Sequence, residues 1–139
     1  MITPDDFKAV CDPQTLQVIH QADPQNLQRA IGYAREEVAS YLRSRYNIEA
    51  AYQQQGADRN PQLVMVLCDV ALYHLVAWLP KRIGFEIREL RYNSAIQWLK
   101  DVQAGKASPC LPPLTDPATG DDIGNPVRYG GWPRNDYMY

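Results

Sequence analysis

Asp69 and His74 interrupt the most apolar stretch of the chain, "QLVMVLCDVALYHLVAWLP", with side chains that could act as an acid, a base or a metal ligand. They are five residues apart, which is about 140° around a helix, so they do not share a face and make a poor metal pair. Buried carboxylates are normally paired. We therefore expect Asp69 to be a structural buried polar residue, and we expect its partner to be on the preceding helix: Arg43, Arg45 or a tyrosine hydroxyl.

The other reactive side chains lack partners at useful spacing. His20 has no second ligand nearby, and Cys11, Cys68 and Cys110 form no C-x-x-C pair. Lys81 and Arg82 are adjacent at a corner, which is more typical of a solvated turn than of a phosphate site. The chain contains no G-x-x-x-x-G-K-[ST], G-x-S-x-G or H-E-x-x-H motif. We expect no catalytic residue, no metal and no cofactor, and hence a protein that is not an enzyme.

Composition gives the broad class. With 139 residues, 45% hydrophobic and 22% charged, the chain has the balance of an ordinary globular domain. The net charge of -2 argues against a protein that coats nucleic acid, because that affinity comes from Lys and Arg contacts with phosphates. An alternative is a small helical DNA-binding or regulatory protein. Against it, Lys8 is the one basic residue between Pro4 and Ala22, where a helix-turn-helix would need a basic recognition face.

Four dipeptides of a short polar residue followed by proline mark helix starts, because the polar side chain caps the helix and proline suits its first position. They are Thr3-Pro4, Asp12-Pro13, Asp23-Pro24 and Asn60-Pro61. The first two predict short helices from Pro4 to Cys11 and from Pro13 to Ala22. The third predicts a long helix from Pro24 to about Arg45 with one apolar stripe.

The fourth start opens the apolar stretch, which ends at Pro80. A membrane span is the alternative, but the stretch is at the short limit, contains Asp69 and is bracketed by prolines. A helix that is apolar all round is otherwise the centre of a bundle. A fifth helix is predicted from Phe85 or Glu86 to Gly105, a residue typical of the position just past a helix end.

The sequence thus predicts an all-α fold: a helical bundle of three long and two short helices over residues 1–105, followed by an extended arm over residues 106–139. The core is expected to close near residue 105. The segment "YNIEAAYQQQGADRN" after the third helix is predicted to be an exposed loop, and "RSRYNIEAAYQQQGADRN", which contains it, is the candidate for a contact. It either lines a channel or contacts a partner, or it is simply solvated.

The arm contains six prolines and four glycines, and its last residues are "YGGWPRNDYMY". Aromatic side chains are typical interface anchors, whereas disordered linkers are poor in them. The arm therefore either binds a partner or covers an apolar patch on its own bundle.

Four segments resemble the Mu-like phage and prophage family of small head-tail joining proteins: "EVASYLRSRY", "LCDVALYHL", "RYNSAIQWLKDVQAGKAS" and the ending "WPRNDYMY". The resemblance runs in order along most of the chain. It implies a head-tail adaptor, a structural virion protein of the neck that is made in the host bacterial cytoplasm.

The resemblance also implies the partners. Twelve copies would form a ring beneath the portal protein, extend the DNA channel, and offer a platform to the next neck or tail-completion protein. DNA would pass through without specific binding, and no membrane would be involved. The arm would reach the portal or a neighbouring copy, with interface residues at its end: Tyr129, Trp132, Arg134, Tyr137 and Tyr139.

Overall fold

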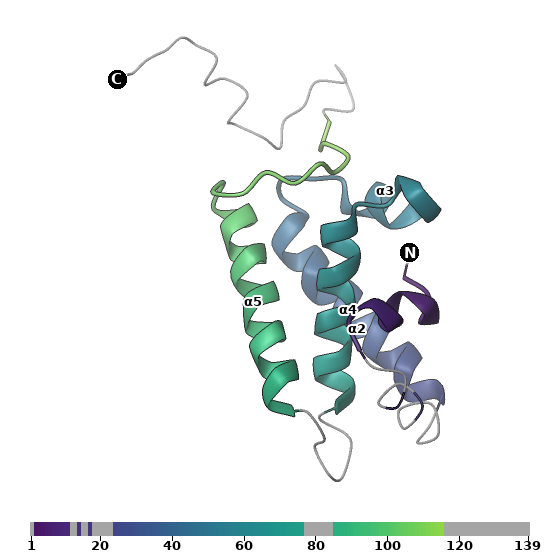
Figure 1. Ribbon diagram of the computed structural model, residues 1–139. Coiled ribbons are helices and arrows are strands. Elements are labelled where there is room, and N and C mark those ends of the chain that lie inside the picture. Colours follow the sequence, from purple (N-terminus) through teal and green to yellow (C-terminus); the bar gives the residue numbers. More distant parts are fainter. Residues whose placement is uncertain (1, 12–13, 15–16, 18–23, 77–84, 116–139) are drawn as a thin grey trace.

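Three long helices pack side by side in the computed structural model, which describes residues 2–11, 14, 17, 24–76 and 85–115 (Figure 1). These are α2 (Pro24–Leu42), α4 (Pro61–Val76) and α5 (Phe85–Gln103). Two 3-10 helices, η1 (Pro4–Ala9) and η2 (Gly56–Asp58), and the short helix α3 (Ile48–Gln53) complete the described elements. The described part contains no strand, only one isolated bridge between Tyr46 and Pro113. The predicted all-α class is confirmed.

Local capping explains where the helices begin and end. Asn60 accepts a hydrogen bond from the Leu63 amide at 3.0 Å, and Pro61 occupies the first position of α4. At the end of α5, Gly105 has φ +84°, and the Lys106 amide donates to the Asp101 carbonyl at 2.8 Å. This is the left-handed helix end that the sequence predicts at Gly105.

The helix α4 lies at the centre of the core, against both α2 and α5. Its apolar residues are buried all around its circumference, as expected for a central helix: Leu63, Val66, Leu67, Val70, Leu72 and Leu75. Burying a leucine or valine side chain contributes about 1.5–3 kcal/mol. Phe7 of η1 is also fully buried, so the N-terminal segment packs on the core. No helix among the described residues combines the length and apolarity needed to cross a membrane.

The segment between α2 and α4 is the predicted exposed loop only in part: residues 55–58 are exposed, whereas the preceding part forms the helix α3 and packs on the core. Asn47 caps α3 by accepting a hydrogen bond from the Ala50 amide at 3.1 Å, and Ile48 and Ala51 are completely buried. Their spacing of three residues places both on one face of a helix. Tyr46 is also buried, and Tyr52 packs against the core. The prediction failed for this part because the few apolar residues that make the contact are set among polar ones.

Packing also continues beyond residue 105, where the core was expected to close. Leu111 is 8% exposed and belongs to the hydrophobic core. The Asn60 side-chain amide donates to the Cys110 carbonyl at 3.0 Å, and the Asn47 amide donates to the Pro112 carbonyl at 2.9 Å. The first part of the Pro-rich segment is therefore held across the ends of the helices.

The other predicted elements are described in part. The helix predicted from Pro4 to Cys11 is the 3-10 helix η1, and the third ends at Leu42 rather than Arg45. Of the helix predicted from Pro13 to Ala22, only Gln14 and Gln17 are described, and both are helical. The corner at Pro80 and the arm from residue 116 onward lie outside the described residues.

Candidate interaction surface between α4 and α5

A groove runs between α4 and α5 on the outside of the molecule. It begins as a cavity of about 220 Å³ whose walls come from these two helices alone. The α4 side contributes Gln62, Met65, Val66 and Asp69, and the α5 side contributes Leu90, Arg91, Ser94, Ala95 and Trp98. These positions recur at steps of three and four, so each helix presents one continuous stripe to the groove.

A second hollow of about 640 Å³ continues this groove toward the N-terminal segment. It shares Met65 and Arg91 with the first cavity. Its other walls are apolar and charged in turn, and they come from η1, η2 and the start of α4: Asp5, Asp6, Ala9, Val10, Gly56, Ala57, Arg59, Pro61 and Val64. The Arg88 guanidinium donates to the Val10 carbonyl at 3.0 Å, which fixes the end of η1 against α5. The two cavities therefore form one elongated groove, which we call the α4–α5 groove.

Large apolar side chains gather along this groove. Met65 is 39% exposed, Leu90 is 68% exposed and Ile87, one turn before Arg91, is 57% exposed. Elsewhere in the described part, Tyr33 on α2 is the other large apolar side chain with high exposure. Single exposed apolar residues are normal on a protein surface, but a contiguous patch marks an interaction site.

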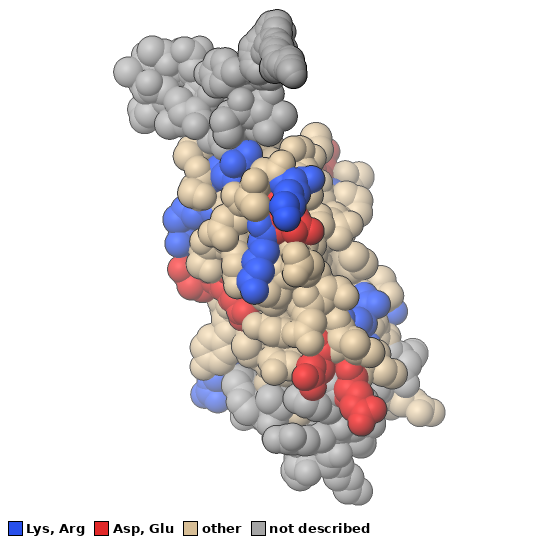
Figure 2. Space-filling view, turned by 90° about the vertical axis from the view of Figure 1, so that its left-hand side faces the viewer, with Lys and Arg blue, Asp and Glu red and all other residues tan. Residues whose placement is uncertain are grey.

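Charge is distributed unevenly around the α5 side of the molecule. Figure 2 shows basic and acidic side chains close together in the upper half of this side, and acidic side chains near its lower end with basic ones at the flanks. Glu86 and Glu89 in the first turns of α5 are exposed and form no ion pair with any described residue. The groove thus has both apolar and charged walls, and the first turns of α5 add two exposed carboxylates near Ile87 and Leu90.

Asp69 and Arg91 form the polar floor of the groove. Arg91 Nε donates to Asp69 Oδ1 at 2.6 Å, and Arg91 Nη2 donates to Asp69 Oδ2 at 3.1 Å. Asp69 is buried, but its partner is on α5, so the expected pairing with Arg43, Arg45 or a tyrosine of α2 is wrong. The reason is rotational: Asp69 lies on the side of α4 that meets α5, whereas α2 packs on another side of α4.

His74 belongs to a different cluster, between α2, α4 and α5. Its Nε2 lies 2.8 Å from Glu37 Oε1, and the Tyr92 hydroxyl donates to Glu37 Oε2. Burial and the neighbouring Glu37 carboxylate raise the pKa of Tyr92. The ring of Tyr92 stacks on that of Tyr73 with centroids 4.0 Å apart. This cluster connects the three long helices, and its residues do not line either cavity of the α4–α5 groove.

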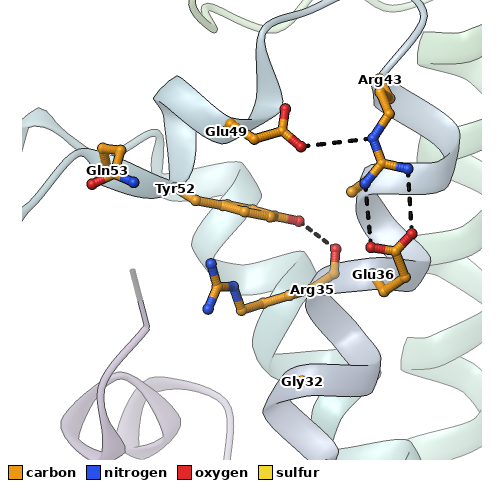
Figure 3. A pocket seen from close by; sticks show the side chains of 8 residues that line it. Gly32, Arg35, Glu36, Arg43, Glu49, Tyr52 and Gln53 are labelled. Carbon is orange, nitrogen blue, oxygen red and sulfur yellow. Dashed lines mark hydrogen bonds and ion pairs between the residues drawn. The ribbon is translucent and has the colours of Figure 1, made fainter.

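A separate cavity of about 290 Å³ lies between α2 and α3. Figure 3 shows Arg43 held between two carboxylates: its Nη2 lies 3.2 Å from Glu36 Oε2, and its Nε lies 3.7 Å from Glu49 Oε1. The hydrogen bond from Arg43 lowers the pKa of Glu36. The Tyr52 hydroxyl donates to the Arg35 carbonyl at 2.7 Å, and the Arg35 guanidinium lies over the Tyr52 ring at 5.0 Å from its centroid.

The cavity between α2 and α3 contains few side chains that could take part in a reaction. The charge of Arg43 is already neutralised, and burial raises the pKa of Tyr52, which makes the phenol a poor acid at neutral pH. Burial likewise raises the pKa of the Cys68 thiol to about 12, so this cysteine stays protonated. Within the described ranges no group of three or more His, Cys, Asp or Glu side chains could hold a metal ion.

The sequence did not single out the residues of the groove. From the sequence, no role is assigned to Leu90, Met65 or Arg91. One signal was present: Ile87 and Leu90 are apolar but lie off the buried stripe of α5, which indicates an exposed apolar surface. The predicted interface residues of the arm lie outside the described residues: Tyr129, Trp132, Arg134, Tyr137 and Tyr139. Their role stays a prediction.

The described part is all-α and carries exposed apolar side chains along a groove between two helices, as is typical of proteins that bind other proteins. The family model for bacteriophage Mu Gp36 matches residues 1–124. The chain therefore belongs to the bacteriophage Mu Gp36 family and is a phage protein. No curated protein and no solved structure gives a significant match.

Proposed function

We propose that this phage protein is a structural component of the virion neck, a head-tail adaptor that forms a ring beneath the portal and extends the DNA channel. Membership of the Mu Gp36 family supports the phage context. The resemblance of four sequence segments to head-tail joining proteins supports the position in the neck. The proposed partners are the portal protein, neighbouring copies in a ring of twelve, and the next neck or tail-completion protein.

The observation that carries the proposal is the α4–α5 groove with its exposed Met65 and Leu90, and with the exposed Ile87 one turn before Arg91 on α5. A closed ring needs a heterologous contact, in which one surface of a subunit meets a different surface of the next. The groove supplies one adhesive surface. The aromatic sequence of residues 127–139 supplies a second, chemically different one.

The charge balance suits a channel through which DNA moves. A net charge of -2 provides no excess of cations to hold phosphates. The arginines Arg43, Arg59 and Arg91 are each paired with a carboxylate within the described part. DNA would therefore pass such a ring without being retained.

The test is to mix the full chain with its cognate portal and image the complex by negative-stain electron microscopy. We expect an added ring on one face of the portal, and mass measurement of the complex should give twelve copies. Leu90→Lys should weaken ring formation, whereas Tyr33→Lys, an equally drastic change on exposed α2 surface, should not. A full chain that folds but leaves the portal bare would contradict the proposed function. Retention on DNA at physiological salt would instead favour a DNA-binding protein.

A further inference from the structure

We propose that the α4–α5 groove is the binding site for residues 127–139 of a neighbouring copy of this chain. The inference rests on the proposed function, because it takes the neighbour to be a ring subunit. It goes beyond that function by assigning one occupant to one surface.

The shape of the groove suits an extended segment. Its two cavities, about 220 and 640 Å³, meet at Met65 and Arg91, so they form an elongated path rather than a single round pocket. In "VRYGGWPRNDYMY" two glycines separate Tyr129 from Trp132, and glycine allows the backbone to place neighbouring side chains in different directions. An extended chain can thus set successive aromatic rings along the path.

The chemistry of the two surfaces is complementary. Aromatic side chains bury about 150–250 Å² each, and methionine sulfur makes favourable contacts with aromatic rings, so Met65, Leu90 and Trp98 offer suitable walls. Residues 127–139 contain two arginines, Arg128 and Arg134, and one aspartate. Glu86 and Glu89 line neither cavity, but both are exposed on α5, next to Ile87 and Leu90 in the sequence. Their carboxylates would attract that excess of positive charge and orient the segment.

The place where the described part of the chain ends is also compatible with residues 127–139 as the occupant. The Cys110 carbonyl is bonded to Asn60, the residue before α4, so the chain passes the α4 end of the groove five residues before Thr115. From Thr115 to Val127 an extended chain spans up to roughly 40 Å at about 3.3 Å per residue. This exceeds the roughly 28 Å length of the 19-residue helix α5. The segment therefore has the reach to extend beyond the length of the bundle's long helices.

A neighbouring copy is the occupant that closes a ring. If each segment entered its own groove, both adhesive surfaces would be used up within one subunit. If each segment enters the groove of the next subunit, every copy uses its segment in one contact and its groove in another. This is the heterologous arrangement that closes a ring. Each contact can then be weak, because linkage raises its effective concentration.

The first experiment uses a fluorescein-labelled peptide of residues 127–139 and the full chain carrying Trp132→Ala and Tyr137→Ala, which removes competition by its own segment. Fluorescence anisotropy should show saturable binding. Adding Leu90→Lys should weaken the affinity about tenfold or more, as expected for loss of an interface anchor, while Tyr33→Lys should leave it unchanged. A peptide with both alanine changes should not bind.

Absence of saturable binding, or equal effects of Leu90→Lys and Tyr33→Lys, would overturn the inference. Leu90 is 68% exposed, so the lysine should not disturb folding, which circular dichroism checks. Ile87→Lys is a second variant with the same expected loss. The peptide assay contains no portal, so its result is independent of the portal imaging. If the peptide does not bind but rings still form on the portal, only the groove assignment is rejected. If the peptide binds but the portal stays bare, the proposed function is rejected.

The second experiment decides between the chain's own groove and a neighbour's. The full chain with benzoylphenylalanine in place of Tyr137 is irradiated together with a mass-tagged chain that carries Trp132→Ala. We expect a cross-linked product of two chains, mapped by mass spectrometry to α4 or α5 of the tagged chain. Cross-links confined to single chains at every concentration would overturn the assignment to a neighbour.

Discussion

Asp69 of α4 and Arg91 of α5 form a two-bond ion pair at the floor of the α4–α5 groove, with Nε–Oδ1 at 2.6 Å and Nη2–Oδ2 at 3.1 Å. The two residues come from different helices, and the Asp69 side chain is 6% exposed while that of Arg91 is 36% exposed. The pair therefore joins the core to the proposed binding surface, and it fixes how α5 is placed beside the central helix.

Loss of the Asp69 carboxylate should destabilise the fold. We expect Asp69→Ala to lower the free energy of unfolding by about 2 kcal/mol, because it leaves the Arg91 guanidinium without its partner, although partial exposure lets water compensate. Urea denaturation measures the change. The matched control is Asp5→Ala, which breaks the exposed Lys8–Asp5 pair and should cost at most about 0.5 kcal/mol. Equal losses in the two variants would show that the Asp69 pair contributes nothing beyond a surface interaction.

Two glycines should respond to alanine in opposite ways. Gly105 has φ +84°, so Gly105→Ala forces a strained left-handed backbone at the end of α5 and should destabilise by about 1 kcal/mol. Gly32 lies inside α2, and a Cβ there would meet nothing within 4 Å. Gly32→Ala should therefore stabilise by about 0.5–1 kcal/mol through helix propensity. Thermal unfolding of the two variants measures both changes in stability. A Gly105→Ala variant that is more stable than the unchanged protein would contradict the observed helix end.

The Asp6–Arg59 pair should give part of the stability a dependence on acid pH. The hydrogen bond from the Arg59 guanidinium lowers the pKa of Asp6 below its ordinary value of 3.8. Because the folded pKa is the lower one, the contribution is fully present above about pH 4 and is lost as the pH falls through the folded value. Urea unfolding between pH 7 and pH 2.5 should show a smaller acid loss for Asp6→Asn than for the unchanged chain. Parallel curves for the two proteins would rule out this contribution.

The Tyr92 hydroxyl should contribute through its bond to Glu37. Tyr92→Phe removes a donor from a carboxylate that also contacts His74, so we expect a loss of about 1–1.5 kcal/mol. Tyr41→Phe is the matched control, because no described side chain or carbonyl pairs with the Tyr41 hydroxyl, and it should change stability by less than about 0.5 kcal/mol. Chemical denaturation of both variants provides the comparison. An unchanged Tyr92→Phe protein would show that Glu37 is satisfied by His74 and water alone.

Local signals in the sequence were sufficient for the main helices. The dipeptides Asp23-Pro24 and Asn60-Pro61 mark the starts of α2 and α4, and Gly105 marks the end of α5, because capping and backbone preferences act over a few residues. The all-round apolarity of α4 likewise predicts its central position. These features depend on short-range chemistry, so they can be deduced without knowing what lies opposite.

Tertiary structure decided the partners. Asp69 pairs with Arg91, 22 residues away, rather than with Arg43 or Arg45, because the rotation of α4 between its neighbours sets which side each residue faces. Leu111 packs on the core from a Pro-rich segment, held there by Asn60 across 50 residues. The α4–α5 groove arises in the same way, since the stripes on two helices become a surface only when packing places them side by side. Residue types in the sequence determined which helices form, and long-range packing determined which of their side chains meet.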